Sequence, residues 1–87
     1  MRSALEHIEQ LLGIDLFLTW EEREKDFWVC NYRNYVLRVM TQSESHDLPV
    51  VWHVAFYNSQ KVEDFGRCKS LHEGRQAAHA YLRKVFR

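Results

Sequence analysis

Residues 50–78, VVWHVAFYNSQKVEDFGRCKSLHEGRQAA, form the stretch that decides the fold. An apolar run over 50–57 predicts a buried strand, the polar residues 58–61 predict a turn, and residues 62–68 predict a second strand. Residues 70–73 then have the Ser-x-x-Glu spacing of a capping box, in which both side chains satisfy free backbone donors of a helix's first turn. Behind this box, one apolar stripe at helical spacing predicts a C-terminal helix, whose small residues would allow a close approach to the sheet: Leu71, Gly74, Ala78, Tyr81, Leu82 and Val85.

Three more strands are predicted upstream of this unit. Alternation with period two over Ile14–Glu21 predicts the first strand, and the charged residues 22–25 predict its connection to the next. Residues Phe27–Tyr32 and Tyr35–Gln42 are rich in aromatic and β-branched side chains and predict two further strands. A turn is expected within residues 31–34, because asparagine tolerates left-handed backbone geometry.

A first helix is predicted before these strands. Residues 3–6 form another Ser-x-x-Glu box, an apolar stripe follows it, and Gly13 is placed to end the helix as a left-handed cap. The predicted fold is therefore a single α+β domain over residues 1–87 with the order α-β-β-β-β-β-α. Its short connections suit antiparallel hairpins, so we expect a curved antiparallel sheet of four to five strands with both helices on one face.

Composition excludes several classes of protein. The chain has 87 residues, which is room for one domain. Apolar residues make up 46% and aromatic residues 14%, which is too apolar a composition for a disordered chain. No run of 18 apolar residues is present and the N-terminal residues lack an apolar signal region, so we expect neither a membrane span nor secretion. A cytoplasmic protein is the resulting expectation, in the host cell if the source is a phage. Cys30 and Cys68 are then expected to be free thiols.

Charge is balanced overall but not along the chain. Lys and Arg number 12, as do Asp and Glu, so the formal net charge is zero. Residues 1–47 carry nine acids and five bases, whereas residues 48–87 carry three acids and seven bases. A molecule that keeps these halves apart presents a positive face to an acidic partner. The electrostatic patch predicted on the basic half is formed by Arg67, Lys69, Arg75 and Arg83.

Sequence signatures of catalysis and metal binding are absent. The chain has no glycine-rich phosphate loop, no nucleophile elbow and no zinc-protease motif. His72 and His79 would lie about 10 Å apart along a helix, too far to share one ion. We therefore expect no metal, no cofactor, no catalytic residue and no enzymatic activity. The alternative that stays open is a small toxin-like ribonuclease that uses His46 or His53 as an acid or base.

Aromatic residues on the predicted strands are the strongest functional signal. Alternation divides them between two sheet faces, and helices on one side need only one of these faces. We expect Trp28, Tyr57 and Arg38 on the other face, as contact residues for a partner. Exposed aromatic and arginine side chains are typical of interface hot spots, and they also suit stacking on unpaired bases. The alternative left open is that strand twist and long loops bury these rings.

The C-terminal third, residues 52–86, resembles the end of a double-stranded RNA-binding domain. In that family a serine begins the last helix, basic residues grip phosphates and an Ala-Ala step packs on the sheet; Ser70, Arg75, Ala77 and Ala78 match this pattern. The lysine pair of the family is replaced here by residues 71–72, Leu-His. The chain is also similar to phage proteins of the anti-CRISPR inhibitor type in its small size, its zero net charge and its aromatic sheet. Those proteins bind an effector complex stoichiometrically.

Two functional hypotheses beside the ribonuclease follow. The first is a non-catalytic protein-binding module, by analogy a phage inhibitor that blocks a host nucleic-acid-targeting complex such as a nuclease. The alternative is a nucleic-acid-binding module related in shape to double-stranded RNA-binding domains, whose binding would weaken steeply with salt. Because zero net charge gives little protection against association, a homodimer that hides the aromatic face is a further expectation.

Overall fold

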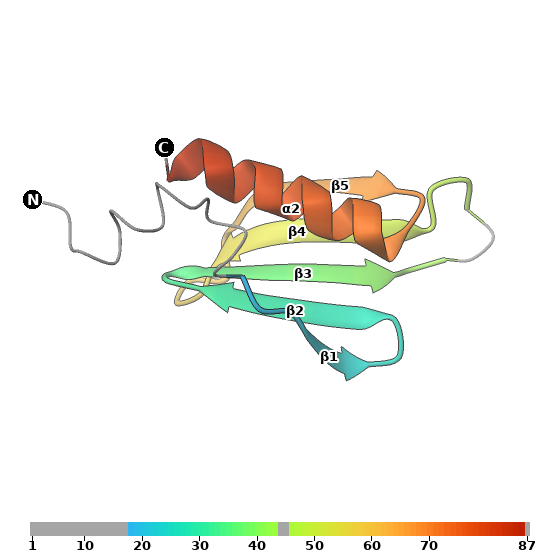
Figure 1. Cartoon of the computed structure of the whole chain (residues 1–87), viewed down its shortest axis with the longest axis horizontal. Coiled ribbons are helices and arrows are strands. Elements are labelled where there is room, and N and C mark those ends of the chain that lie inside the picture. The colour runs from blue at the N-terminus through green and yellow to red at the C-terminus, as the bar shows by residue number, and fades with distance from the viewer. Residues whose placement is uncertain (1–17, 44–45, 87) are drawn as a thin grey trace, which may run out of the picture.

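In the part of the chain that the structure describes, one antiparallel sheet carries one helix on one of its faces. The computed structural model describes residues 18–43 and 46–86. Every strand pairs antiparallel with its neighbour in the sequence, in the order β1-β2-β3-β4-β5 (Figure 1). This arrangement confirms an α+β domain built on an antiparallel sheet. The elements are β1 (Glu21–Glu24), β2 (Phe27–Tyr32), β3 (Tyr35–Thr41), β4 (Val50–Phe56), β5 (Val62–Cys68) and α2 (Leu71–Val85).

Most predicted boundaries agree with the structure, but the first strand does not. β2 and β5 span the predicted residues, and β3 and β4 each end one residue early. Residues 14–17 of the strand predicted over 14–21 lie outside the described residues, and Leu18–Trp20 is not in a strand. The charged connection predicted at residues 22–25 is wrong, because Glu21–Glu24 is the strand β1. The physical reason is the tight turn at Lys25-Asp26, where Asp26 has a φ of 59° and folds the charged segment directly onto β2. The predicted first helix, including Gly13, lies outside the described residues.

A two-residue turn between β2 and β3 decides which side chains share a face. Arg33 has a φ of 55°, and Tyr32 pairs directly with Tyr35. Because opposite residues in an antiparallel pair point to the same face, the even-numbered residues of β2 lie with the odd-numbered residues of β3. Cys30 and Leu37 therefore point towards α2 together.

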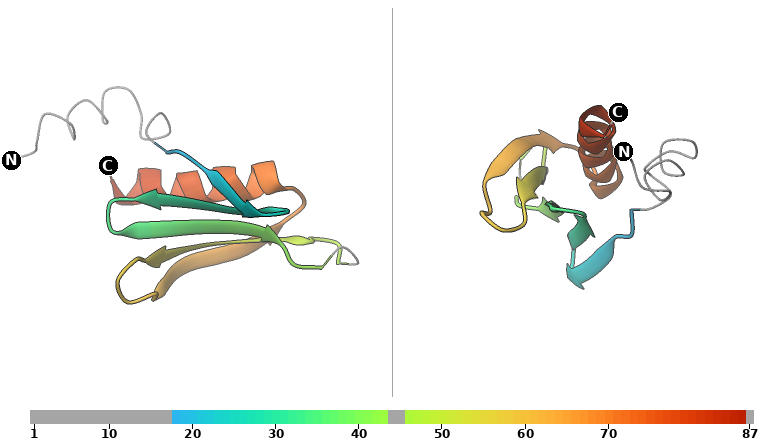
Figure 2. Two further views of the ribbon diagram at one scale, coloured as in Figure 1. Left: turned by 90° about the horizontal axis from the view of Figure 1, so that it is seen from below. Right: turned by 90° about the vertical axis from the view of Figure 1, so that its left-hand side faces the viewer.

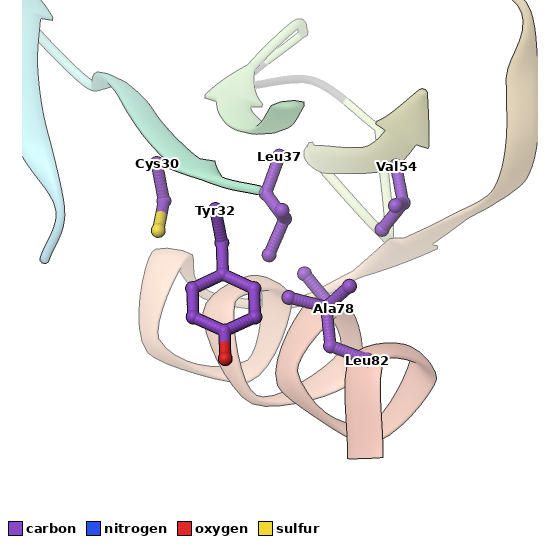
Figure 3. Close-up of a cluster of buried hydrophobic side chains, with 6 residues drawn as sticks. All are labelled: Cys30, Tyr32, Leu37, Val54, Ala78 and Leu82. Carbon is purple, nitrogen blue, oxygen red and sulfur yellow. The ribbon is translucent and has the colours of Figure 1, made fainter. Parts of the chain in front are cut away.

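α2 begins at the predicted capping box. The backbone N–H of Glu73 donates to Ser70 Oγ at 3.1 Å, and the Glu73 carboxylate accepts from the backbone N–H of Lys69 at 3.1 Å. The helix then runs along one face of the curved sheet (Figure 2). The core lies between them, where four side chains from the strands face two from the helix (Figure 3): Cys30, Tyr32, Leu37, Val54, Ala78 and Leu82.

Two glycines allow close approaches in this core. A Cβ built on Gly74 would lie 2.5 Å from Cγ1 of Val39, so the helix backbone rests almost directly on the middle strand. A Cβ built on Gly66 in β5 would lie 2.7 Å from Nε1 of Trp52, because the indole ring of β4 lies over this position. The predicted close approach of the helix at Gly74 is thereby confirmed.

Candidate functional site

The sheet face opposite α2, which we call the open face, is the candidate site. No helix among residues 18–43 and 46–86 covers it. The strand registers place its side chains in cross-strand rows that are mainly apolar but contain two arginines and one histidine. These rows are Phe27–Met40–Val51–Arg67, Val29–Arg38–His53–Phe65 and Asn31–Val36–Ala55–Val62.

Arg38 is fixed at the centre of the open face by two neighbours. Its Nη1 lies 3.2 Å from Nε2 of His53, and its Nη2 donates to Oε1 of Gln60 at 3.0 Å. Gln60 is held in turn by its Nε2, which donates to the backbone oxygen of Tyr57 at 2.6 Å. Gln60 also has a φ of 57°, so the β4–β5 turn brings its side chain back over the sheet. The guanidinium is therefore held in place before any partner binds, which lowers the entropic cost of using it in an interface.

His53 is kept neutral by this environment. Partial burial disfavours the charged imidazolium, and the guanidinium of Arg38 repels it, so the pKa of His53 lies below its ordinary value. A neutral imidazole protonated at Nδ1 can accept a hydrogen bond from Arg38 through Nε2. The pair is thus arranged as arginine donor and histidine acceptor, and the positive charge stays on Arg38.

Three exposed apolar residues lie on β5 or in the β4–β5 connection. The side chains are exposed by 72% for Phe65, 58% for Tyr57 and 47% for Val62. Val62 and Phe65 share a face although they are three residues apart, because a β-bulge between them shifts the register of β5 against β4. Large apolar side chains left together in water beside an ordered arginine are the composition of an interface core.

The structure places the predicted contact residues on different faces. Arg38 lies on the open face, and Tyr57 follows β4 at its exposed end. Trp28 instead lies on the α2 side, where the guanidinium of Arg75 stands 5.1 Å from the centre of its ring. The expected placement of Trp28 on the same face as Arg38 is therefore corrected. The reason is the two-residue turn after β2, which pairs Trp28 with Val39.

The four predicted patch residues do not form one cluster. Arg67 lies on β5 and bonds the backbone oxygen of Leu48 at 2.9 Å and Oε1 of Gln42 at 2.7 Å, which closes one end of the sheet. Lys69 lies in the link to α2 and is exposed. Arg75 faces Trp28, and Arg83 lies two helical turns further along α2. The basic residues are thus spread over both faces of the molecule.

In the described part of the chain, His46 and His79 each form a hydrogen bond within the fold. No group of three or more His, Cys, Asp or Glu side chains that could hold a metal ion occurs in the described part of the chain. His46 Nδ1 accepts from the backbone N–H of Leu48 at 2.9 Å and so supports its own loop. His79 is buried: its ring stacks on Trp20, and its Nε2 accepts from Trp20 Nε1 at 2.7 Å.

Both cysteines are free thiols, as predicted. Cys30 is buried against α2, and burial raises the pKa of its thiol to about 11. Burial also raises the pKa of Cys68, whose Sγ donates to the backbone oxygen of Ser70 at 3.3 Å. Neither thiol has the lowered pKa that marks a nucleophilic cysteine.

Sequence reasoning missed two members of the candidate site. Val62 was assigned only to a strand, because the bulge that turns it to the open face leaves no pattern in the sequence. Gln60 was assigned only to a turn, although a polar side chain at a left-handed position next to two strands is placed to reach back over them. Both residues come from the β4–β5 connection, where the backbone departs from regular strand geometry.

Comparison with known proteins adds no relative. No protein-family model matches the chain, and searches of curated proteins and of solved structures found no significant match. No helix in the described residues is long and apolar enough to cross a membrane.

Proposed function

We propose that the protein is a non-catalytic binding module that docks on another folded protein through its open face. The observation that carries this proposal is the exposed Phe65, 72% accessible, beside the prearranged Arg38 guanidinium. An isolated exposed ring would need no explanation, but Val62 is exposed on the same face, and Tyr57 is exposed in the β4–β5 connection. Aromatic anchors and arginine are the residues that contribute most to protein interfaces.

The partner is expected to present an apolar surface that contains a carboxylate. Arg38 lies on the middle strand, and a second copy stacked face to face through this strand would place two arginines against each other. A carboxylate would instead form a charge-assisted bond with a guanidinium that is already oriented. By analogy with small phage inhibitors of the anti-CRISPR type, we propose that this partner is a nuclease or effector complex that the protein blocks stoichiometrically.

Paired variants test the protein-binding proposal. Tagged protein is used to capture partners from the native host, and captured proteins are identified by mass spectrometry. The variant Arg38→Ala/Tyr57→Ala should lose a specifically captured protein, while His72→Ala, an exposed change on α2, should retain it. Equal capture by both variants, or capture of nothing by the wild type, would refute docking through the open face.

Nucleic-acid binding remains the second candidate, because Phe65 and Arg38 would also suit an unpaired base. The first turn of α2 is less suited to phosphate than in the RNA-binding family, since the Glu73 carboxylate already occupies it. Titration with duplex and single-stranded RNA at two salt concentrations separates the candidates. Binding that falls steeply with salt would favour RNA, and no binding at low salt would exclude it.

A further inference from the structure

The two edges of the sheet are built differently. β1 is a four-residue edge strand, all of whose residues are charged and exposed, and its register is interrupted by a bulge. Short, charged and bulged edges are the usual protection against pairing with another chain. β5, the opposite edge, has seven residues and carries the two exposed apolar side chains of Val62 and Phe65. Both edges contain a bulge, and they differ because β1 is shorter and wholly charged.

The backbone of Phe65 points outwards from this second edge. In an antiparallel ladder, alternate residues turn their N–H and C=O groups away from the neighbouring strand. The N–H of Phe65 donates to Oδ1 of Asp64 at 2.9 Å and not to a carbonyl of β4. This donor is thus satisfied only by the side chain of an adjacent residue, which a strand added to the edge could replace.

A second donor without an acceptor, the indole N–H of Trp52, lies near the β5 edge on the α2 side of the sheet. The indole of Trp52 lies over Gly66, with its Nε1 2.7 Å from where a Cβ of Gly66 would stand. No acceptor within the described residues bonds this N–H, in contrast to the indole N–H of Trp20, which His79 accepts. An acceptor that arrives at the β5 edge could bond this N–H.

We propose that β5 pairs antiparallel with β5 of a second copy, about a two-fold axis through Phe65. In this register the two Phe65 residues exchange both backbone hydrogen bonds. Asp64 of each copy then stands opposite Gly66 of the other, in a pair without backbone bonds, where side chains approach most closely. The Asp64 carboxylate, which no longer accepts from the Phe65 N–H, can then accept from the indole N–H of Trp52 of the other copy. The hydrogen bond that Asp64 loses within its own chain is thereby replaced by one across the dimer.

Charge order along β5 supports the same register. The acidic residues of this strand, Glu63 and Asp64, precede its single basic residue, Arg67. Antiparallel pairing centred on Phe65 therefore brings the acidic end of one β5 beside the basic end of the other, with Glu63 in the bulge of the strand. Opposite charges at facing positions stabilise a strand pair. The contact uses the same surface on both copies, and the ten-stranded sheet that results ends in β1 on both sides. Because both outer edges are then charged and bulged, assembly stops at the dimer.

Molecular mass measured by sedimentation equilibrium, from micromolar to near-millimolar concentration, tests this dimer. Wild-type protein should approach twice the monomer mass as concentration rises. Phe65→Pro removes only an outward-facing donor, so it should give a monomer that keeps the helical circular dichroism signal; Phe65→Ala, which keeps the donor, should still dimerise. A wild-type monomer at near-millimolar concentration, or a Phe65→Pro dimer, would overturn the proposal.

Two further variants test the register. Trp52→Phe removes both symmetry-related indole donors and should weaken dimerisation about a hundredfold. Asp64→Ala should weaken it as well, because the acceptor is lost. Stronger dimerisation of Asp64→Ala would mean that Asp64 guards the edge, and would refute the pairing. Arg38→Ala/Tyr57→Ala should dimerise normally, so a failure of partner capture remains separate from a failure of the dimer.

Discussion

Replacing Gly74 by alanine has two opposing effects on stability: it raises helix propensity, and it crowds the packing between α2 and the sheet. Gly74 lies in the first half of α2, and in a free helix this change should stabilise the fold by about 1 kcal/mol. In the folded protein the new Cβ would lie 2.5 Å from Cγ1 of Val39 and 3.4 Å from Sγ of Cys68. Val39 is fully buried in the middle strand and β-branched, so rotation of its side chain out of this space is restricted.

The packing cost should exceed the gain in helix propensity. Overpacking a filled core costs about 1–3 kcal/mol, and here the helix would have to rise from the sheet and loosen the contacts of Ala78 and Leu82. We expect Gly74→Ala to be less stable than the wild type by up to about 2 kcal/mol. Urea denaturation followed by circular dichroism at 222 nm measures the difference.

Two controls isolate the cause. Ala80→Gly changes an exposed position of the same helix and should cost about 1 kcal/mol, which calibrates the propensity term in this protein. The double variant Val39→Ala/Gly74→Ala should be more stable than the sum of its single changes, with a coupling of about 1–2 kcal/mol. A Gly74→Ala protein more stable than the wild type would refute the reasoning, since the helix would then adjust without cost.

Three further predictions concern single side chains. The pKa of His53 is lower in the folded state than in the unfolded state, so protonation favours unfolding. The free energy of unfolding should therefore fall as the pH drops below the unfolded-state pKa of about 6.5. His53→Gln should make this fall smaller, as measured by the midpoint of urea denaturation at each pH. Cys68 should react with a thiol reagent before Cys30, whose thiol is buried with a pKa of about 11, and simultaneous reaction of both in native buffer would contradict the described packing. His79→Ala should cost about 1–3 kcal/mol through the lost hydrogen bond and stacking with Trp20, whereas His72→Ala on the exposed side of α2 should change stability by less than about 0.5 kcal/mol in thermal melts.

Local signals predicted the elements well, and long-range signals were absent. The Ser70 capping box located the start of α2 because its bonds join residues three and four apart. The bond between Trp20 and His79 joins residues 59 apart, so no local pattern reported that His79 is buried. The sheet face on which Trp28 lies could be predicted from the sequence, because a two-residue turn fixes which residues of β2 and β3 share a face. The bulge that adds Val62 to the open face could not be predicted, since it depends on how β5 fits against β4.

The meander order of the strands also has a consequence for folding. Each strand pairs with the strand next to it in sequence, so every closure needed to build the sheet is short. The β1–β2 and β2–β3 turns take two residues each, whereas residues 42–49 separate β3 from β4. We therefore expect the β3–β4 closure, in the part of the sheet on which α2 rests, to be the slow step in assembly. Lengthening that loop should slow refolding more than an equal insertion between β1 and β2.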